Sequence, residues 1–263
     1  MADSRGYLTL ASYRAASALL SLVFSASAAL AGPAQAAPAT DPGPLPACSY
    51  QDVLTARTAY TDWDKSLLDP IYMLPADYVP PDLVYASEAG ITGGGRVRSL
   101  AITDLRAMTA AAKAAGKPIA VSSAYRSYTR QSELFEADIV RLGYEGALLH
   151  TARPGHSEHQ LGTAIDFRSK RIGDRSPNGD WAQSKAGRWM KNNAWKYGWV
   201  MSYPEGKTAV TCYDYEPWHY RYFGRTVAAQ IQASGLTVRE WLWQQGYGLP
   251  VATRSVGEMA PAA

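Results

Sequence analysis

The sequence predicts one folded domain that mixes helices and strands. Residues 99–115 carry apolar side chains at helical spacing, and Gly116 follows where a C-terminal cap belongs. Residues 119–123 and 163–167 are short runs rich in β-branched and apolar residues, which is typical of strands. The 263 residues are enough for one large core, and a mean hydropathy of -0.23 argues against a polytopic membrane protein.

Both ends of the chain differ in composition from this domain. Arg5 and Arg14 precede an uncharged run, and Ala34-Gln35-Ala36 has the A-x-A pattern of a signal-peptide cleavage site. We therefore expect export, with an uncleaved N-terminal membrane anchor as the alternative. The expected parts are a signal peptide at 1–36, a flexible Pro/Ala-rich lead-in at 37–47, the folded domain at 48–249 and a disordered tail at 250–263.

Further elements follow from local pattern. Ser127 is a suitable N-cap for a helix that runs to Leu142, and Thr237 with Glu240 forms a capping box. The remaining expectations are helical character at 51–60, an extended strap at 69–81, loops at 93–95 and 150–162, a polar turn at 171–180, a helix at 182–193, and strands at 199–203 and 211–222 joined in a hairpin by 204–206.

Charge and cysteine content restrict the partners and the compartment. A net charge of +3 without a block of Lys or Arg gives little support for nucleic-acid binding but suits an anionic cell wall. We expect a monomer without an obligate protein partner. Cys48 and Cys212 are the two cysteines, and in an exported chain they are expected to form a disulfide. Two unpaired thiols remain the alternative.

Two segments hold residues suited to a metal site. His159 and Asp166 are seven residues apart, and Gly162 between them permits a tight turn. Glu216 and His219 follow about fifty residues later, where Pro217 disfavours a ligand-bearing helix. Catalytic zinc sites use three protein ligands and keep one open position. His159, Asp166 and His219 are therefore the expected Zn²⁺ ligands, which leaves Glu216 as the general base.

The same segments allow other choices of metal ligand and general base. His156 and His159 have a ligand spacing that suits a helix, although Pro154 and Gly155 disfavour a helix there. Glu158 is an alternative base, but a neighbour of a ligand on extended backbone normally points away from it. We expect His150 to be a surface or structural residue.

A zinc ion with a general base is suited to the hydrolysis of a peptide bond. That reaction also needs a group that stabilises negative charge on oxygen. Arg126 lies at the end of the strand at 119–123 and carries a permanent charge, so it is the first candidate. Arg153 and Arg221 are weaker candidates. Ser157 is placed to hydrogen-bond the terminal carboxylate of a substrate.

Three blocks of this sequence occur together in one known family. They are Ser123-Ala124-Tyr125-Arg126-Ser127 with Gln131, the stretch 152–166 that contains Ser157-Glu158-His159-Gln160 and Asp166, and Glu216-Pro217-Trp218-His219-Tyr220-Arg221-Tyr222. In this order they closely resemble the VanY-type D-alanyl-D-alanine carboxypeptidases of the M15 zinc peptidases. The resemblance covers roughly residues 65–245.

The resemblance implies an α+β fold: a single compact domain with a central antiparallel sheet flanked by helices, of the hedgehog and D,D-peptidase type. It implies zinc ligands His159, Asp166 and His219, catalytic Glu216 and a transition-state-stabilising Arg126. Substrate contacts are expected from Ser157, Tyr125, Gln131 and Trp218.

The implied activity is removal of the terminal D-Ala from peptidoglycan stem peptides outside the cytoplasm. Alternatives are an L,D-carboxypeptidase or peptidoglycan endopeptidase that uses the same site. Two readings from other classes are a non-catalytic wall-binding module with a structural zinc and a hedgehog-type signalling domain. A closed structural site needs no spare base, so Glu216 argues against the wall-binding module.

Overall fold

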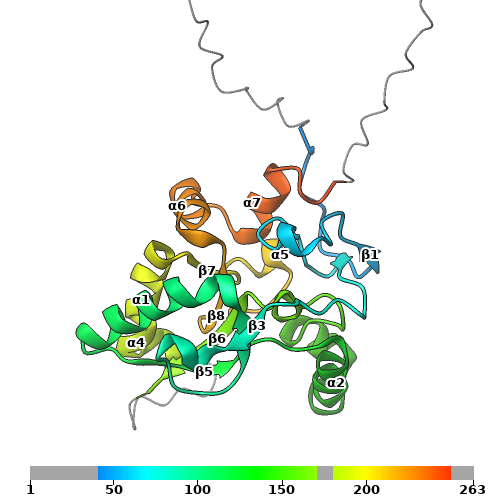
Figure 1. Ribbon diagram of the computed structural model, residues 1–263. Helices are drawn as coiled ribbons and strands as arrows, with labels where there is room; N and C mark the ends of the chain where they lie inside the picture. The colour runs from blue at the N-terminus through cyan, green and yellow to red at the C-terminus, as the bar shows by residue number, and fades with distance from the viewer. Residues whose placement is uncertain (1–40, 171–179, 250–263) are drawn as a thin grey trace, which may run out of the picture. The chain divides into compact units, whose positions relative to one another are not determined.

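The computed structural model describes residues 41–170 and 180–249 (Figure 1). The expected signal peptide, the disordered tail and nearly all of the polar turn at 171–180 lie outside the described residues. The strands are β1 (Val53–Leu54), β2 (Tyr72–Met73), β3 (Leu83–Tyr85), β4 (Arg96–Arg98), β5 (Ile119–Ser123), β6 (Ala164–Ser169), β7 (Trp199–Met201) and β8 (His219–Tyr222). The helices are α1 (Ile102–Ala114), α2 (Tyr128–His150), α3 (Asp180–Gln183), α4 (Lys185–Asn193), α5 (Thr208–Thr211), α6 (Gly224–Ser234) and α7 (Val238–Gln244).

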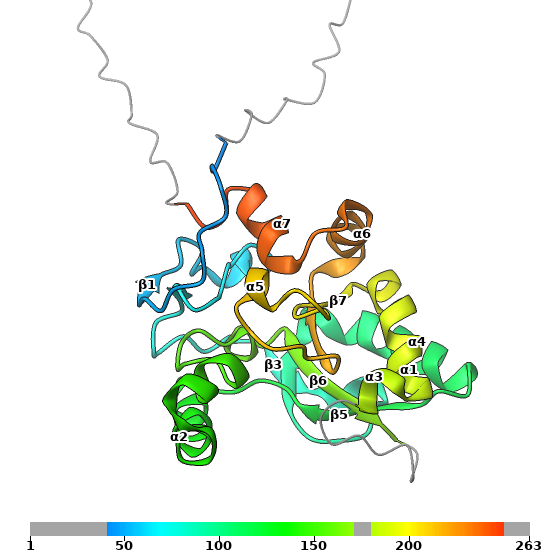
Figure 2. The same ribbon diagram turned by 180° about the vertical axis from the view of Figure 1, so that it is seen from behind.

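A four-stranded sheet in the order β5-β6-β8-β7 lies at the centre, and all of its neighbouring strands are antiparallel. This confirms the expected α+β fold with a central antiparallel sheet. Successive side chains of a strand point to opposite faces, so each face has its own composition. One face carries Ile165, Phe167 and Tyr220, which belong to the main hydrophobic core. Figures 1 and 2 show α1 and α4 together at one side of the sheet and α2 at the opposite side.

The N-terminal segment 48–78 crosses the outside of this domain as a strap. Its β1 pairs in parallel with β2, and Leu67 enters a second apolar cluster that is built mainly from α6 and α7. Cys48 and Cys212 form the disulfide that the sequence predicts, with a Cα–Cα distance of 5.5 Å. The strap is therefore joined covalently to the segment that leads toward Glu216.

Several local predictions are confirmed. The helix expected at 99–115 is α1 with a preceding 3-10 turn, and the strand expected at 119–123 is β5. Ser127 caps α2 by accepting a hydrogen bond from the backbone N of Arg130 at 3.2 Å, and the capping box of Thr237 and Glu240 opens α7. Helix α2 continues beyond the predicted end at Leu142, with a break in helical geometry at Gly143.

Two predictions are wrong. Residues 51–60 are not helical, because the backbone N–H groups of Gln51, Val53 and Thr55 donate to carbonyls of residues 70–73. Residues 211–222 do not form one strand, since Cys212 ends α5 with φ of 68° and β8 begins only at His219. Strands β7 and β8 do pair, but residues 202–218 connect them in place of the expected turn at 204–206.

Candidate metal centre

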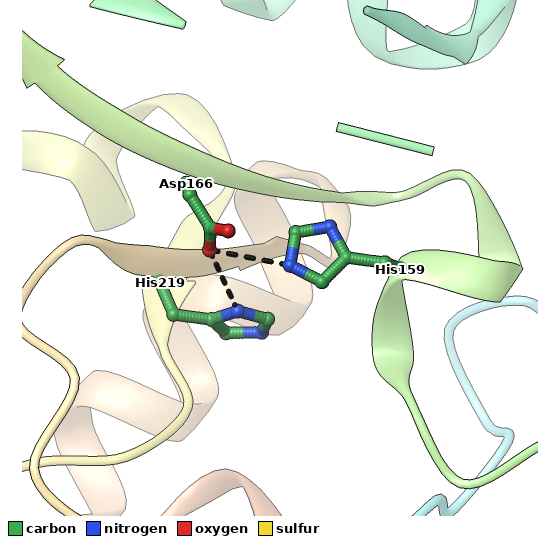
Figure 3. Close-up of side chains that lie close together, drawn as sticks. All are labelled: His159, Asp166 and His219. Carbon is green, nitrogen blue, oxygen red and sulfur yellow. Dashed lines mark hydrogen bonds and ion pairs between the residues drawn. The ribbon is translucent and has the colours of Figure 1, made fainter. Parts of the chain in front are cut away.

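The face of the sheet opposite the main core brings the predicted ligands together. Asp166 on β6 and His219 on β8 are directly paired across the antiparallel ladder, so their side chains project side by side. Asp166 Oδ1 lies 3.1 Å from His219 Nδ1 and 3.2 Å from His159 Nε2 (Figure 3). One ligand atom from each of the three residues lies within 4.8 Å of the others.

His159 reaches this face from a single 3-10 turn, η4 (Glu158–Leu161). The Ser157 hydroxyl begins the turn by accepting from the backbone N of His159 at 3.3 Å. Gly162 ends it with φ of 72°, and a Cβ there would lie 2.8 Å from Leu83 Cδ2. Glycine is therefore favoured by the left-handed backbone, whereas the leucine methyl could shift to admit a Cβ.

The second nitrogen of each imidazole has its own partner. His159 Nδ1 donates to the carbonyl of Ala124 at 2.7 Å, and His219 Nε2 donates to Glu158 Oε2 at 2.9 Å. These contacts leave His159 Nε2 and His219 Nδ1 directed at Asp166. Two imidazole nitrogens and a carboxylate oxygen, with the outer nitrogens held by acceptors, make a donor set that fits a zinc ion.

Burial and hydrogen bonding act in opposite directions on the two rings. Burial lowers the pKa of His159 to about 4, which favours the neutral form that binds metals. Burial also opposes charge on His219, but hydrogen bonds to Asp166 and Glu158 outweigh it and raise its pKa to about 10. A proton on Nδ1 of His219 would have to leave before that atom could bind a metal.

Glu216 lies beside the three candidate ligands without being part of the set. Its Oε2 is 3.7 Å from His219 Nδ1, and burial raises its pKa to about 7. The backbone N of Glu216 donates to the carbonyl of Tyr203, and the indole N–H of Trp181 donates to the carbonyl of Pro217 at 2.7 Å. These two contacts position the 216–219 segment from both sides.

Arg126 lies across the site from Glu216. Its Nη2 is 4.0 Å from Asp166 Oδ2, and its backbone N donates to the carbonyl of His159. Both side chains border a cavity of about 220 Å³. The lining consists of Arg126, Gln131, His150, Thr151, Ala152, Ser157, His159, Asp166, Tyr203, Tyr213, Glu216, Trp218 and His219.

Three of the four expected substrate-binding residues line the cavity, and one does not. Ser157, Gln131 and Trp218 all line the cavity. The amide nitrogen of Gln131 uses one of its two N–H donors on the carbonyl of Ala152 at 2.7 Å. Tyr125 is not among the lining residues, and its ring packs under the guanidinium of Arg96 at 5.6 Å.

The alternative candidates have other partners. His156 is buried, with Nδ1 2.7 Å from the carbonyl of Asp69 and Nε2 3.1 Å from a carboxylate oxygen of Asp52. Arg153 pairs with the same Asp52 carboxylate at 2.6 Å. Both residues therefore fasten the strap to the domain. His150 lines the edge of the cavity.

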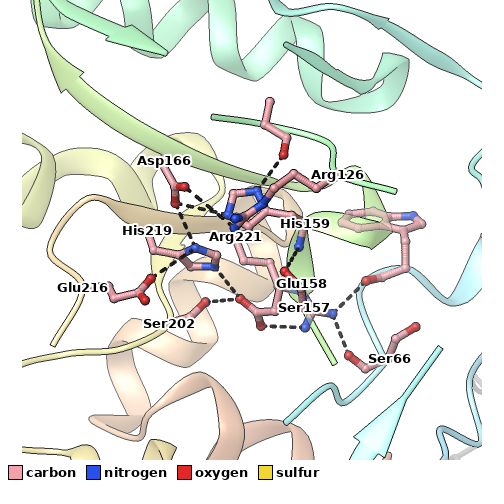
Figure 4. A network of polar contacts seen from close by, with 12 residues as sticks. Ser66, Arg126, Ser157, Glu158, His159, Asp166, Ser202, Glu216, His219 and Arg221 are labelled. Atoms are coloured by element: carbon pink, nitrogen blue, oxygen red, sulfur yellow. Dashed lines mark hydrogen bonds and ion pairs between the residues drawn. The ribbon is translucent and has the colours of Figure 1, made fainter. Parts of the chain in front are cut away.

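Glu158, Arg221 and Tyr203 are the residues at the site whose roles the sequence did not indicate. The Glu158 carboxylate lies between His219, Ser202 and Arg221 (Figure 4). The ring of Tyr203 packs against that of His219 at 4.9 Å. The sequence did contain a signal for Glu158, because Ser157 and Gly162 bracket a single turn. In such a turn adjacent side chains diverge without lying on opposite faces as they do in a strand. His219 and Arg221 are also two apart on a strand and share its face.

Comparison with known proteins agrees with this geometry. A sequence model of the VanY family, described as D-alanyl-D-alanine carboxypeptidase, matches residues 95–225. A solved structure of the LdcB L,D-carboxypeptidase, which reveals the basis of its peptidoglycan recognition, is 35% identical in sequence with a TM-score of 0.62. The similarity covers 69% of this chain and 87% of that one. The chain belongs to the VanY family.

Two further relatives extend the comparison. A VanY D,D-pentapeptidase mutant from a VanB-type vancomycin-resistance cassette, solved in complex with Zn(II), is 30% identical with a TM-score of 0.59. Its similarity covers 68% of this chain and 99% of that one. YodJ of Bacillus subtilis (strain 168) is 38% identical over 181 residues, which are 67% of this chain and 66% of that protein. The matched part is thus slightly less than two thirds of YodJ.

Proposed function

We propose that this chain is an exported, zinc-dependent D-alanyl-D-alanine carboxypeptidase that acts on peptidoglycan stem peptides. The observation that carries the proposal is the convergence of His159 Nε2, Asp166 Oδ1 and His219 Nδ1 with Glu216 Oε2 3.7 Å from the last of these. The family match and the Zn(II) complex of a VanY relative support the same activity.

The three ligands would hold one zinc ion, which when bound polarises a carbonyl and lowers the pKa of water. Glu216 accepts a proton from the attacking water and returns it to the departing amine. The buried position of its carboxylate supports this role, since a pKa of about 7 suits both transfers at neutral pH. Arg126, across the cavity, stabilises the negative charge that develops on the carbonyl oxygen.

The cavity supports a small, polar chain end as the substrate. Its volume of about 220 Å³ is below the range of about 300–1,000 Å³ that drug-sized ligands occupy. The Ser157 hydroxyl and the Arg126 guanidinium are the groups available for a terminal carboxylate. A second candidate activity is L,D-carboxypeptidase cleavage, which the similarity to the LdcB L,D-carboxypeptidase favours.

No helix among the described residues is long and apolar enough to cross a membrane. Export is proposed from the N-terminal sequence and from the cell-wall substrate implied by the relatives.

The test is to incubate the purified chain with a pentapeptide stem ending in D-Ala-D-Ala, a tetrapeptide stem and a cross-linked dimer, with and without a chelator. We expect D-Ala release from the pentapeptide that stops on chelation and returns with zinc. Release from the tetrapeptide alone would establish the L,D activity, and cleavage of the dimer an endopeptidase. Metal binding without any cleavage would replace the proposal with a wall-binding module.

A further inference from the structure

The carboxylate of Glu158 is buried and receives three hydrogen bonds. Oε2 accepts from His219 Nε2 at 2.9 Å and from the Ser202 hydroxyl at 2.5 Å. Oε1 accepts from Arg221 Nη1 at 2.9 Å. Only 3% of the side chain is exposed, so a charge at this position needs compensation within the protein.

Arg221 provides that compensation and also fixes the position of the carboxylate. Its side chain is fully buried, and its Nη2 donates to the carbonyls of Trp63 and Ser66, each at 2.9 Å (Figure 4). The guanidinium is thus held by the strap on one side and by Glu158 on the other. Because a guanidinium is planar and rigid, Glu158 has little freedom to turn away from His219.

This arrangement decides which nitrogen of His219 faces Asp166. An imidazole offers a metal only the nitrogen that carries no proton, and the hydrogen bond of the other nitrogen fixes the choice. Of the two nitrogens of His219, Nε2 is the one that donates to Glu158. Nδ1 is therefore directed at Asp166 Oδ1, at 3.1 Å. Rotation of the ring by half a turn would break the contact with Glu158.

We propose that Glu158, held by Arg221, is a positioning residue that fixes the tautomer and ring orientation of His219 for metal binding. The inference rests on the proposed function for its metal, whereas the tautomer itself can be measured without metal. Glu158 thereby differs from Glu216, which faces the cavity and acts on the substrate.

A purely structural ion pair is the competing explanation, and the chain contains a matched example. Asp69 pairs with Arg239 at 2.6 Å, and both side chains are as buried as those of Glu158 and Arg221. Asp69 Oδ1 accepts from the backbone N–H groups of Ile71 and Tyr72, so this carboxylate closes the strap. Among the described residues, no hydrogen bond joins either side chain of this pair to His159, Asp166 or His219.

The decisive variant is Glu158→Gln, with Asp69→Asn as its control. A glutamine oxygen can accept from His219 or from Arg221, and its NH₂ group then opposes the other donor. We expect zinc affinity, measured by competition with a chelator, to fall about 10- to 100-fold in Glu158→Gln. Both variants should lower the melting temperature of the metal-free protein, since each leaves a buried arginine without its negatively charged partner. Asp69→Asn should bind zinc like the wild type.

A second measurement decides the inference without any substitution. Nitrogen-15 NMR of the histidines in the metal-free wild type, at a pH above the His219 pKa of about 10 so that the ring is neutral, should show His219 with its proton on Nε2. In Glu158→Gln the same signal should move toward a mixture of tautomers.

Equal zinc affinity in Glu158→Gln and wild type, or a wild-type His219 protonated on Nδ1, would overturn the inference. Failure of the wild type to bind zinc would instead refute the proposed function, and the tautomer of metal-free His219 would still decide the role of Glu158.

Discussion

Two glutamates near His219, the buried Glu158 and the half-buried Glu216, have opposite surroundings. Burial raises the pKa of both, but in Glu158 the charge of Arg221 and the hydrogen bond from His219 outweigh it and lower the pKa to about 2. At Glu216 burial dominates, and the pKa is raised to about 7. A carboxylate that stays charged suits a fixed acceptor, whereas one that titrates near neutrality suits proton transfer.

Glu216→Gln tests this division of roles. The amide keeps the size of the side chain but cannot accept and return a proton, so kcat should fall about 10²- to 10⁴-fold. Zinc content, measured by elemental analysis, should stay at the wild-type level because Glu216 is not one of the three ligands. Glu205→Gln, at an exposed position in the same connecting segment, is the control and should retain full activity. Unchanged kcat in Glu216→Gln would remove this residue from the mechanism.

Among single residues, the sequence predicted those for which the proposed chemistry allows the fewest residue types. His159, Asp166, Glu216 and His219 follow from residue type, spacing and a multi-part motif. The contact of Glu158 with His219 was not predicted, because extended backbone was assumed where η4 makes one turn. The partners that hold each imidazole, such as the Ala124 carbonyl, depend on how β5 packs beside η4. Sequence spacing carries no information about such contacts.

Helix α2 shows how side chains secure an element whose backbone is interrupted. Gly143 has non-helical angles, φ of 74° and ψ of 166°, within the span Tyr128–His150. Asp138 lies before this break and accepts from the Thr151 hydroxyl beyond it and from Arg141 at 2.7 Å. Burial alone would raise the pKa of Asp138, but these hydrogen bonds lower it on balance.

Asp138→Asn should destabilise the protein by about 1 kcal/mol at neutral pH. A carboxyl whose folded pKa lies below its unfolded pKa stabilises the native state above the unfolded value, and this contribution disappears as pH falls through the folded value. The difference between variant and wild type in the free energy of unfolding, measured with urea, should therefore shrink as pH falls from about 5 toward 2. Glu136→Gln, exposed on the same helix, should show no such pH-dependent difference. A difference that stays constant over this pH range would exclude the carboxylate charge as its cause.

Element prediction succeeded where local pattern and tertiary packing agree. The buried residues of α1 are Ile102, Leu105, Met108 and Ala112, at the helical spacing seen in the sequence. The segment 211–222 is rich in aromatic residues and resembles a strand. The left-handed conformation of Cys212 and the turn before His219, however, end that pattern early. The first lies at the Cys48–Cys212 disulfide and the second at the group His159, Asp166 and His219, and both are long-range features.

The strap connects distant parts of the whole molecule. Asp69 pairs with Arg239 of α7, its carbonyl contacts His156, and the Ser66 carbonyl accepts from Arg221 beside the site. Leu67 and Leu68 enter two separate apolar clusters. All of these strap residues precede residue 95, where the match to the VanY family begins. The region that matches the family therefore relies on a segment outside it for its packing and for the support of Glu158.

A fragment that begins at residue 95 should consequently fail to fold cooperatively. It would leave Arg221 and Arg239 without their strap partners and expose the apolar surfaces that Leu67 and Leu68 cover. Arg239 would lose its buried ion-pair partner, which costs about 3–5 kcal/mol, and Arg221 would keep Glu158 but lose two carbonyl acceptors, at about 1–3 kcal/mol each. The total stability of a domain is about 5–15 kcal/mol. Thermal unfolding followed by circular dichroism, together with zinc binding, would measure the effect. A fragment of residues 41–249 keeps the described contacts and should unfold like the full chain. A cooperative transition and wild-type zinc affinity in the shorter fragment would show that the strap is dispensable.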